Sequence, residues 1–406
     1  MMRSIVIFLL AILTGAGDAR DRPEIIVTRC DERQATASIA AHAPPIAKPL
    51  ALVRVDCLAF PDEEFSASDP QLSPDGTAIF LFDSSVGLFI TQPGSDEGRR
   101  HGGRVLDVSD GLGPVRWAAD GRSVLGATQS TLRPSGFARG PLRLTRFPVV
   151  RPPTPLPGAP GPADDLDEVH WLNGKGLALA AYSTLGTYYR PERPNRSPRL
   201  AFIDAVRGRT LDSIALSAVP GWTPDGMLGG VAGSVDASGR AFALLTLPND
   251  RWVFWRQSQA PRALSLTLDM ASKFALTPDG KRALIMRQLS AVGVICEYPS
   301  RCDPPTPRDG PIAQLIDLAT GSILWTIDGT AKTFSNDDWP VIGPDGRYAL
   351  ISMPDDGIAL IRLADGREVQ QLPGSRWSSV AMGFLADGRG VWLGDGASLA
   401  RYAWRP

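Results

Sequence analysis

Short apolar runs alternate with tight polar turns along most of the chain. The phrase LSPDG at residues 72–76 precedes the apolar run AIFLF, and LTPDG at 276–280 and IGPDG at 342–346 have the same setting. Looser versions of the turn occur at Asp120-Gly121, Asn173-Gly174, Ser238-Gly239 and Asp387-Gly388. Asp-Gly and Asn-Gly favour tight hairpins because glycine accepts positive φ freely. The pattern therefore predicts a series of β-hairpins, and helical periodicity is nearly absent after the first residues.

One repeat shows the whole unit. The runs WPVI, RYALISM, IALIRL and REVQQL follow one another between residues 339 and 372, separated by the turns GPDG, PDDG and ADG. Four short strands joined by tight turns form one antiparallel blade, and such blades arranged radially form a β-propeller. We predict an all-β fold, a β-propeller of seven four-stranded blades. Eight blades are the alternative, because WTPDG at 222–226 competes with DASGR at 236–240 as the turn of the fourth unit.

The two ends of the repeat region complement each other. The last unit supplies only three strands before the chain ends, while the apolar run LALVRV at 50–55 precedes the first turn. We expect this N-terminal strand to complete the last blade and close the ring. The predicted organisation is a signal peptide at 1–19, an N-terminal extension at 20–49 and a propeller over 50–406.

The turns also carry a resemblance to known proteins. The units resemble the WD-repeat-like propeller repeats with an (S/T)-P-D-G turn, which are known from the periplasmic propeller of the Tol-Pal system. The similarity covers most of residues 60–406 and implies a partner-binding scaffold. It implies no functional residue, because the Pro-Asp-Gly turns of that family are structural.

The N-terminus reads MMRSIVIFLLAILTGAGDA. One arginine, an apolar run and small residues up to Ala16 or Ala19 are typical of a secretory signal peptide. An uncleaved membrane anchor is the alternative. Since no later segment is apolar enough for a membrane span, which needs about 18 residues, we predict a periplasmic or secreted protein.

Four cysteines fit an oxidising compartment, where disulfides persist. Cys296 and Cys302 enclose five residues and are expected to pair, which leaves Cys30 to Cys57. The second pair would tie the N-terminal extension to the propeller. A metal site is the weaker interpretation, because these spacings match no common zinc pattern and the chain has only His42, His101 and His170 to add.

Three units carry long insertions between their second and third strands. These are TLRPSGFARGP at 131–141, LGTYYRPERPNRSPR at 185–199 and the segment 289–311. Equivalent loops of a propeller emerge on one face, and tyrosine and arginine are enriched at protein interfaces. We expect this face to bind another envelope or secreted protein; solvated loops are the alternative. The candidate partner-binding residues are Tyr188, Tyr189, Arg190, Arg193, Arg196, Tyr298 and Arg301, together with Arg133 and Arg139.

The proline-rich segment RPPTPLPGAPGP at 151–162 favours an extended conformation. We interpret it as a stiff linker between the second and third blades, with a docking segment as the alternative. The net charge of −1 argues against nucleic-acid binding, which usually leaves a basic surface.

Signals for catalysis are isolated. DLATGSILW at 317–325 resembles the Asp-x-x-x-Gly-x-x-x-Trp motif of quinoprotein dehydrogenase propellers, through Asp317, Gly321 and Trp325, but it occurs once. There is no Gly-x-Ser-x-Gly elbow. His170 lies in a predicted first strand and is a candidate for facing a ligand in the channel, or a buried structural histidine. We therefore expect a binding or scaffolding protein without cofactor or metal; the alternative is a propeller enzyme with its site at the channel mouth, acting on a small molecule or glycan.

Overall fold

A computed structural model describes the chain over residues 28–29, 52–59, 71–74, 76, 78–83, 87–91, 116–118, 121–131, 139–148, 154–156, 166–172, 176–182, 198–223, 230–247, 251–266, 273–287, 308–331, 340–353, 357–373, 381–394 and 398–404. The regular elements within these ranges are β-strands and one short 3-10 helix, η2 (Leu216–Ala218). No helix in the described ranges is long and apolar enough to cross a membrane.

The strands form small antiparallel sheets in chain order. The first sheet contains β3 (Gln71–Leu72), β4 (Ile79–Asp83) and β5 (Gly87–Thr91). The second contains β6 (Arg116–Trp117), β7 (Ser123–Thr131), β8 (Arg139–Pro148) and β9 (Thr154–Pro155). The third contains β10 (Leu166–Trp171), β11 (Leu177–Tyr182), β12 (Arg199–Asp204) and β13 (Arg209–Ala215). The fourth contains β14 (Gly230–Val235), β15 (Ala241–Leu247), β16 (Arg251–Arg256) and β17 (Arg262–Leu264).

The remaining sheets continue the same order. The fifth contains β18 (Lys273–Leu276), β19 (Arg282–Met286), β20 (Arg308–Asp317) and β21 (Ile323–Ala331). The sixth contains β22 (Val341–Ile342), β23 (Tyr348–Met353), β24 (Gly357–Arg362) and β25 (Glu368–Pro373). The last contains β26 (Ala381–Phe384), β27 (Gly390–Gly394), β28 (Ser398–Trp404), β2 (Leu52–Ala59) and β1 (Thr28–Arg29).

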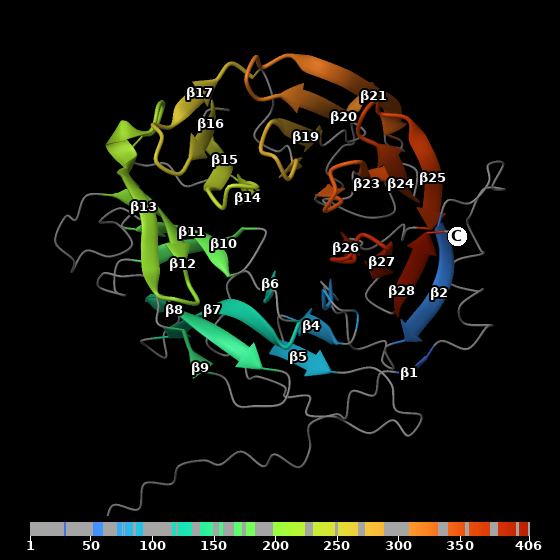
Figure 1. Cartoon of the computed structure of the whole chain (residues 1–406), viewed down its shortest axis with the longest axis horizontal. Coiled ribbons are helices and arrows are strands. Elements are labelled where there is room, and N and C mark those ends of the chain that lie inside the picture. The colour runs from blue at the N-terminus through green and yellow to red at the C-terminus, as the bar shows by residue number, and fades with distance from the viewer. Residues whose placement is uncertain are drawn as a thin grey trace, which may run out of the picture.

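These sheets are arranged radially as a β-propeller, with β6, β10, β14 and β26 near the centre and β13, β17, β21 and β25 at the periphery (Figure 1). The all-β propeller with four-stranded blades is thus confirmed. The count of seven four-stranded blades is not: six sheets have four or more strands, and the β3–β5 sheet has three. Residues 92–115, between β5 and β6, lie outside the described residues.

The repeated turns connect the first two strands of each sheet. In LTPDG, Gly280 adopts a φ of 65°, and the Asp279 carboxylate accepts hydrogen bonds from the Thr277 hydroxyl and the Lys281 amide. A Cβ atom at Gly280 would also lie 3.0 Å from the Phe242 ring of the preceding sheet. In the fourth sheet, DASGR is the hairpin turn, because β14 ends at Val235 and β15 begins at Ala241. The turns are therefore structural, as the sequence predicts.

The proline-rich segment is not only a linker, which corrects that interpretation. Thr154 and Pro155 form β9 and pair with Arg146 and Thr145 of β8 as the outer strand of the second sheet. The amide of Leu156 extends this ladder by donating to the Leu144 carbonyl. Proline has no backbone N–H to donate. It is tolerated here because β9 is an edge strand, and one side of an edge strand has no neighbouring strand to accept such a bond.

The strand β2 from the N-terminal part of the chain lies beside the C-terminal strand β28 (Figure 1). The two pair from Leu52 and Trp404 to Ala59 and Ser398, so β2 begins and ends later than the predicted run at 50–55. Gln370 of the neighbouring sheet reaches the same strand. Its side-chain oxygen accepts from the Leu52 amide at 2.7 Å, and its side-chain nitrogen donates to the Leu52 carbonyl at 3.1 Å.

The core lies between the faces of neighbouring sheets. The third and fourth sheets share one buried apolar cluster, in which the rings of Phe202 and Trp255 stack with centroids 4.1 Å apart. A few side chains also form polar links from one sheet to the next. The Trp325 indole of β21 donates to the Leu363 carbonyl at 2.9 Å, and Arg262 of β17 donates to the Leu318 carbonyl. Apolar burial supplies the attraction between blades, and these links fix their relative position.

Candidate ligand-binding cavity

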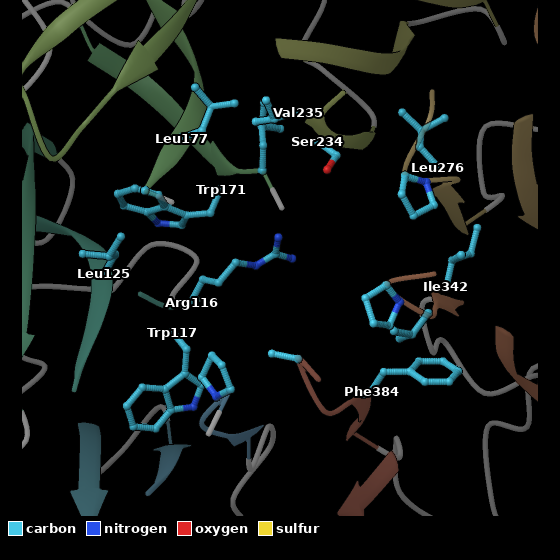
Figure 2. A pocket seen from close by; sticks show the side chains of 18 of the residues that line it. Arg116, Trp117, Leu125, Trp171, Leu177, Ser234, Val235, Leu276, Ile342 and Phe384 are labelled. Atoms are coloured by element: carbon cyan, nitrogen blue, oxygen red, sulfur yellow. The ribbon is translucent and has the colours of Figure 1, made fainter. Parts of the chain in front are cut away.

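The inner strands and their turns enclose a cavity of about 980 Å³ at the centre of the molecule (Figure 2). Pro74, Pro278 and Pro344 of the repeated turns line it, as does Arg207 from the turn between β12 and β13. The cavity therefore opens on the face where first strands turn into second strands. The insertions expected to bind a partner connect second to third strands, so they leave the opposite end of each blade.

Seven structurally equivalent residues are part of the lining of this cavity. Each is the last paired residue of its first strand, opposite the first or second residue of the strand that follows the turn. All seven are apolar and all line the cavity, and together we call them the apolar collar: Leu72, Trp117, Trp171, Val235, Leu276, Ile342 and Phe384. Because every sheet contributes one member, the collar surrounds the cavity on all sides.

Trp117 of the collar is held in place by a polar contact and a ring contact. The Trp117 indole donates a hydrogen bond of 3.0 Å to the Gln71 carbonyl of the preceding sheet. Its ring also lies 5.6 Å from that of Phe80. Trp117 is 8% exposed and Trp171 is 8% exposed, so each presents only an edge or face to the cavity. These contacts fix the position of the Trp117 ring in the collar.

Arg116 brings a positive charge to the cavity lining. It precedes Trp117 on β6, and its side chain extends into the cavity between Trp117 and Trp171 (Figure 2). Burial lowers the pKa of the Arg116 guanidinium from its usual value, but an arginine keeps its charge in proteins. Ser234 and Gln71, which precede collar residues on two other sheets, add uncharged polar groups.

The two carboxylates among the lining residues are both bound within their own turns. Asp204 accepts from the amide and the guanidinium of Arg207, at 3.0 and 2.9 Å, and lies 3.6 Å from Arg209. Asp236 accepts from the hydroxyl and amide of Ser238, and these bonds together with Arg256 hold its pKa below the usual range. Both groups are turn caps, and the lowered pKa of Asp236 is the opposite of what a general acid needs.

Most residues singled out from the sequence have no described position. The candidate partner-binding residues Tyr188, Tyr189, Arg190, Arg193, Arg196, Tyr298 and Arg301 lie outside the described residues, as do Cys30, Cys296, Cys302 and the side chain of Cys57. His170 is in β10, the first strand of its sheet, as predicted, and is partly exposed. The cavity lining includes its neighbours Trp171 and Leu172 but not His170.

The quinoprotein-like motif has structural roles in this chain. Asp317 caps the turn between β20 and β21 by accepting from the amides of Ala319 and Thr320. Gly321 has a φ of 73° in that turn. Trp325 bonds to the next sheet, as described above, and a Cβ at Gly366 would lie 2.8 Å from its ring. None of the three residues lines the cavity.

The described part of the chain contains no group of three or more histidine, cysteine, aspartate or glutamate residues placed to hold a metal ion. No protein-family model matches this sequence, and no curated protein matches it significantly.

The apolar collar and Arg116 are the features that sequence reasoning missed. A signal was present, because the collar residue comes just before the turn in LSPDG, LTPDG and IGPDG. Leucine and isoleucine are common in strands, so an apolar residue at this position does not by itself indicate a binding site. Only the radial arrangement brings the seven positions together.

Proposed function

We propose that the protein is a binding module whose ligand enters the cavity bounded by the apolar collar. The observation that carries this proposal is the uniform apolar character of seven equivalent positions around one cavity. Ligand sites are typically concave, mostly apolar and furnished with a few polar groups, at volumes of about 300–1,000 Å³. The cavity of about 980 Å³ with Arg116, Gln71 and Ser234 corresponds to this description.

Binding is favoured over catalysis by the state of the carboxylates. An acid–base pair needs groups with pKa values near the working pH. Asp236 has a lowered pKa and three donors from its own turn, and Asp204 is held by two arginines. Carboxylates that are engaged by donors of their own turns stabilise those turns, which suits a scaffold better than an enzyme.

The insertions between second and third strands form the second part of this proposal. We propose that Tyr188, Tyr189, Arg190, Arg193, Arg196, Tyr298 and Arg301 bind another envelope or secreted protein on the opposite face. The resemblance of the repeats to the Tol-Pal propeller supports a scaffold, and the N-terminal residues 1–19 support export to the periplasm or beyond. Replacing residues 186–197 by a short Gly-Ser turn is expected to abolish binding of a partner identified by cross-linking; retained binding would contradict it.

The same proposal includes a ring of seven blades closed by β2, with the β3–β5 sheet as one blade. Pairing of β2 with β28 and the Gln370 bonds to Leu52 support closure. A Cys30–Cys57 disulfide would secure it. The register of β1 supports this pair, because Thr28 is opposite Ala59 and Arg29 is opposite Leu58, the immediate neighbours of the two cysteines. Mass spectrometry of the unreduced protein after proteolysis would identify the linked peptides or exclude them.

The cavity can be tested with N-phenyl-1-naphthylamine, a neutral apolar dye that fluoresces on leaving water. We expect saturable binding to the wild type, and a loss of affinity of about tenfold or more in Ile342→Asp, because a carboxylate in the collar is costly to desolvate. Ile323→Asp is the matched control. Ile323 is 53% exposed on the outer strand β21, so the same substitution there should change affinity by less than about twofold.

Two further measurements make this test decisive. Val235→Asp places the charge on another sheet of the same collar and should act like Ile342→Asp. Circular dichroism and thermal unfolding identify any variant that fails to fold. If folded Ile342→Asp and Val235→Asp proteins bind the dye as the wild type does, the cavity is not its site and the proposed function is wrong.

A further inference from the structure

The apolar collar has an aromatic part and an aliphatic part. The collar residues of the second, third and last sheets are Trp117, Trp171 and Phe384. Those of the fourth, fifth and sixth sheets are all aliphatic: Val235, Leu276 and Ile342. Leu276 and Ile342 lie across the cavity from Trp117 and Trp171 (Figure 2). A ligand in the cavity would therefore meet different surroundings on its two sides.

Trp392 adds a further aromatic ring on the same side, although it is not part of the collar. It lies on β27 between Val391 and Leu393, which pack in the cluster shared with the sixth sheet. Because side chains alternate along a strand, Trp392 points to the other face of its sheet. That face meets the first sheet, since β26 contacts β3. A Cβ atom at Gly383 would lie 2.7 Å from the Trp392 indole, so the ring covers this glycine, and both residues line the cavity.

The first sheet lies between these aromatic residues. On one side is the second sheet, whose Trp117 donates to the Gln71 carbonyl and packs 5.6 Å from the Phe80 ring. On the other side is the last sheet, with Trp392. Four aromatic side chains thus follow one another from the last sheet to the third, with Leu72 of the collar between them. We call these four residues the aromatic arc: Phe384, Trp392, Trp117 and Trp171.

Building on the proposed function, we infer that the ligand of this cavity is a planar aromatic molecule that binds against the aromatic arc. Aromatic rings have a negative face and a positive edge, so a flat ring gains offset-stacked or edge-to-face contacts that a saturated ligand does not. The three indoles of the arc are 7–8% exposed, so each presents an edge or a part of its face to the ligand. The aliphatic side of the collar contributes apolar burial without this preference.

This recognition does not depend on the charge of Arg116. Arg116 lines the cavity, but it already has an interaction partner within the protein. A neutral aromatic ligand leaves that interaction intact, because its contacts with the arc arise from ring electrostatics and dispersion. The ligand class therefore follows from the arrangement of the rings alone.

Two alcohols with the same bicyclic carbon framework separate aromatic contact from apolar burial. 2-Naphthol is planar and aromatic, whereas decahydro-2-naphthol is saturated, and both are uncharged at neutral pH. We expect the wild type to bind 2-naphthol about tenfold more tightly in isothermal titration calorimetry, because each aromatic pair adds a preference beyond burial. Trp171→Leu and Phe384→Leu should each lower this ratio of affinities by about threefold or more.

Ile342→Leu is the matched control on the aliphatic side of the collar. It conserves side-chain volume and removes no ring, so the ratio of the two affinities should change by less than about twofold. Circular dichroism and thermal unfolding identify any variant that does not fold. If neither arc variant folds, the wild-type ratio decides, because equal affinities for the two alcohols contradict the inference.

The outcomes separate this inference from the proposed function. If Ile342→Asp abolishes binding of both alcohols but the wild type binds them equally, the cavity binds ligands and the aromatic inference is wrong. Equal losses for both alcohols in Trp171→Leu and Phe384→Leu would also refute it. A third ligand, 1-decanol, has the same number of carbons in a flexible chain, and tighter binding of 1-decanol than of 2-naphthol would assign the cavity to alkyl ligands instead. If Ile342→Asp changes binding of none of these compounds or of N-phenyl-1-naphthylamine, the proposed function itself fails.

Discussion

Replacing Gln370 with methionine should release β2 from the neighbouring sheet. Gln370 is 5% exposed, and its amide group bonds to both the N–H and the C=O of Leu52, which is itself 1% exposed. Methionine has a similar length and can occupy the same space, but it can neither donate to the carbonyl nor replace the amide oxygen as an acceptor. The substitution therefore removes two hydrogen bonds and leaves two buried backbone groups without them.

The magnitude follows from these groups. Each hydrogen bond contributes about 1 kcal/mol net, and a buried donor or acceptor left without a partner costs about 1–3 kcal/mol. The N–H and the C=O of Leu52 both lose their partner, and water entering at the edge of β2 offsets part of this cost. The expected loss is about 2–4 kcal/mol in the free energy of unfolding. This should appear as a lower urea midpoint, with faster proteolysis of the segment that precedes β3.

Gln314→Met provides the control. Gln314 is buried to a similar degree, at 6% exposure, but makes a single 3.3 Å bond to the Thr326 hydroxyl within its own sheet. Its side-chain oxygen has no hydrogen-bond partner among the described residues. We expect the free energy of unfolding of this variant to lie within about 0.5 kcal/mol of the wild-type value. Equal effects of Gln370→Met and Gln314→Met would show that the bonds to Leu52 do not hold β2.

Three other substitutions probe single contacts. Trp325→Phe keeps an aromatic side chain, although a smaller one, and removes the N–H that donates to the Leu363 carbonyl. The free energy of unfolding should fall by about 1 kcal/mol or more, measured in urea; an unchanged midpoint would exclude a docking role for the indole. Arg362→Met should raise the pKa of Asp365 from about 2 towards 3.8 in an NMR titration, because the guanidinium bond holds that pKa low. Because the folded pKa is depressed, the stabilisation from this carboxylate is present above about pH 4 and is lost as pH falls through about 2; an unshifted titration would refute the assignment. Burial raises the pKa of Tyr182 to about 12 and its hydroxyl has no partner in the described residues, so Tyr182→Phe should retain stability at neutral pH. It should also lose less stability than the wild type as pH rises from 10 to about 12, measured by thermal unfolding; parallel alkaline profiles would contradict this.

Local features of the fold were predictable because they depend on a few neighbouring residues. The contacts of Thr277, Asp279 and Gly280 all lie within the LTPDG turn, so this hairpin and the strands on either side of it follow from local sequence. Pairing of the two chain ends could also be anticipated from an incomplete last unit. The strand formed by Thr154 and Pro155 could not, because its pairing with β8 overrides the usual preference of proline-rich segments.

The candidate site could not be predicted in the same way, because its residues are far apart in the sequence. Seven apolar side chains become a collar only when the sheets are arranged radially, and no spacing in the sequence encodes that convergence. Arg116 precedes AADG, one of the weakest versions of the turn, so nothing local distinguished it from other arginines. The predicted partner surface relied on tyrosine and arginine composition, which reports how a segment could interact and not where it lies.

The pairing of β2 with β28 also affects how the protein reaches its native state. Other sheets are built from strands that follow one another closely, whereas this one joins residues 52–59 to 398–404. Contacts between such distant segments carry a large chain-closure entropy and form slowly. During synthesis the hairpins between the two segments can form first. The backbone N–H and C=O groups of β2 that pair with β28 have no partner until β28 has been synthesised. Completion of this sheet is therefore a late event, and the interval before it is when the chain is most exposed to aggregation and to folding helpers.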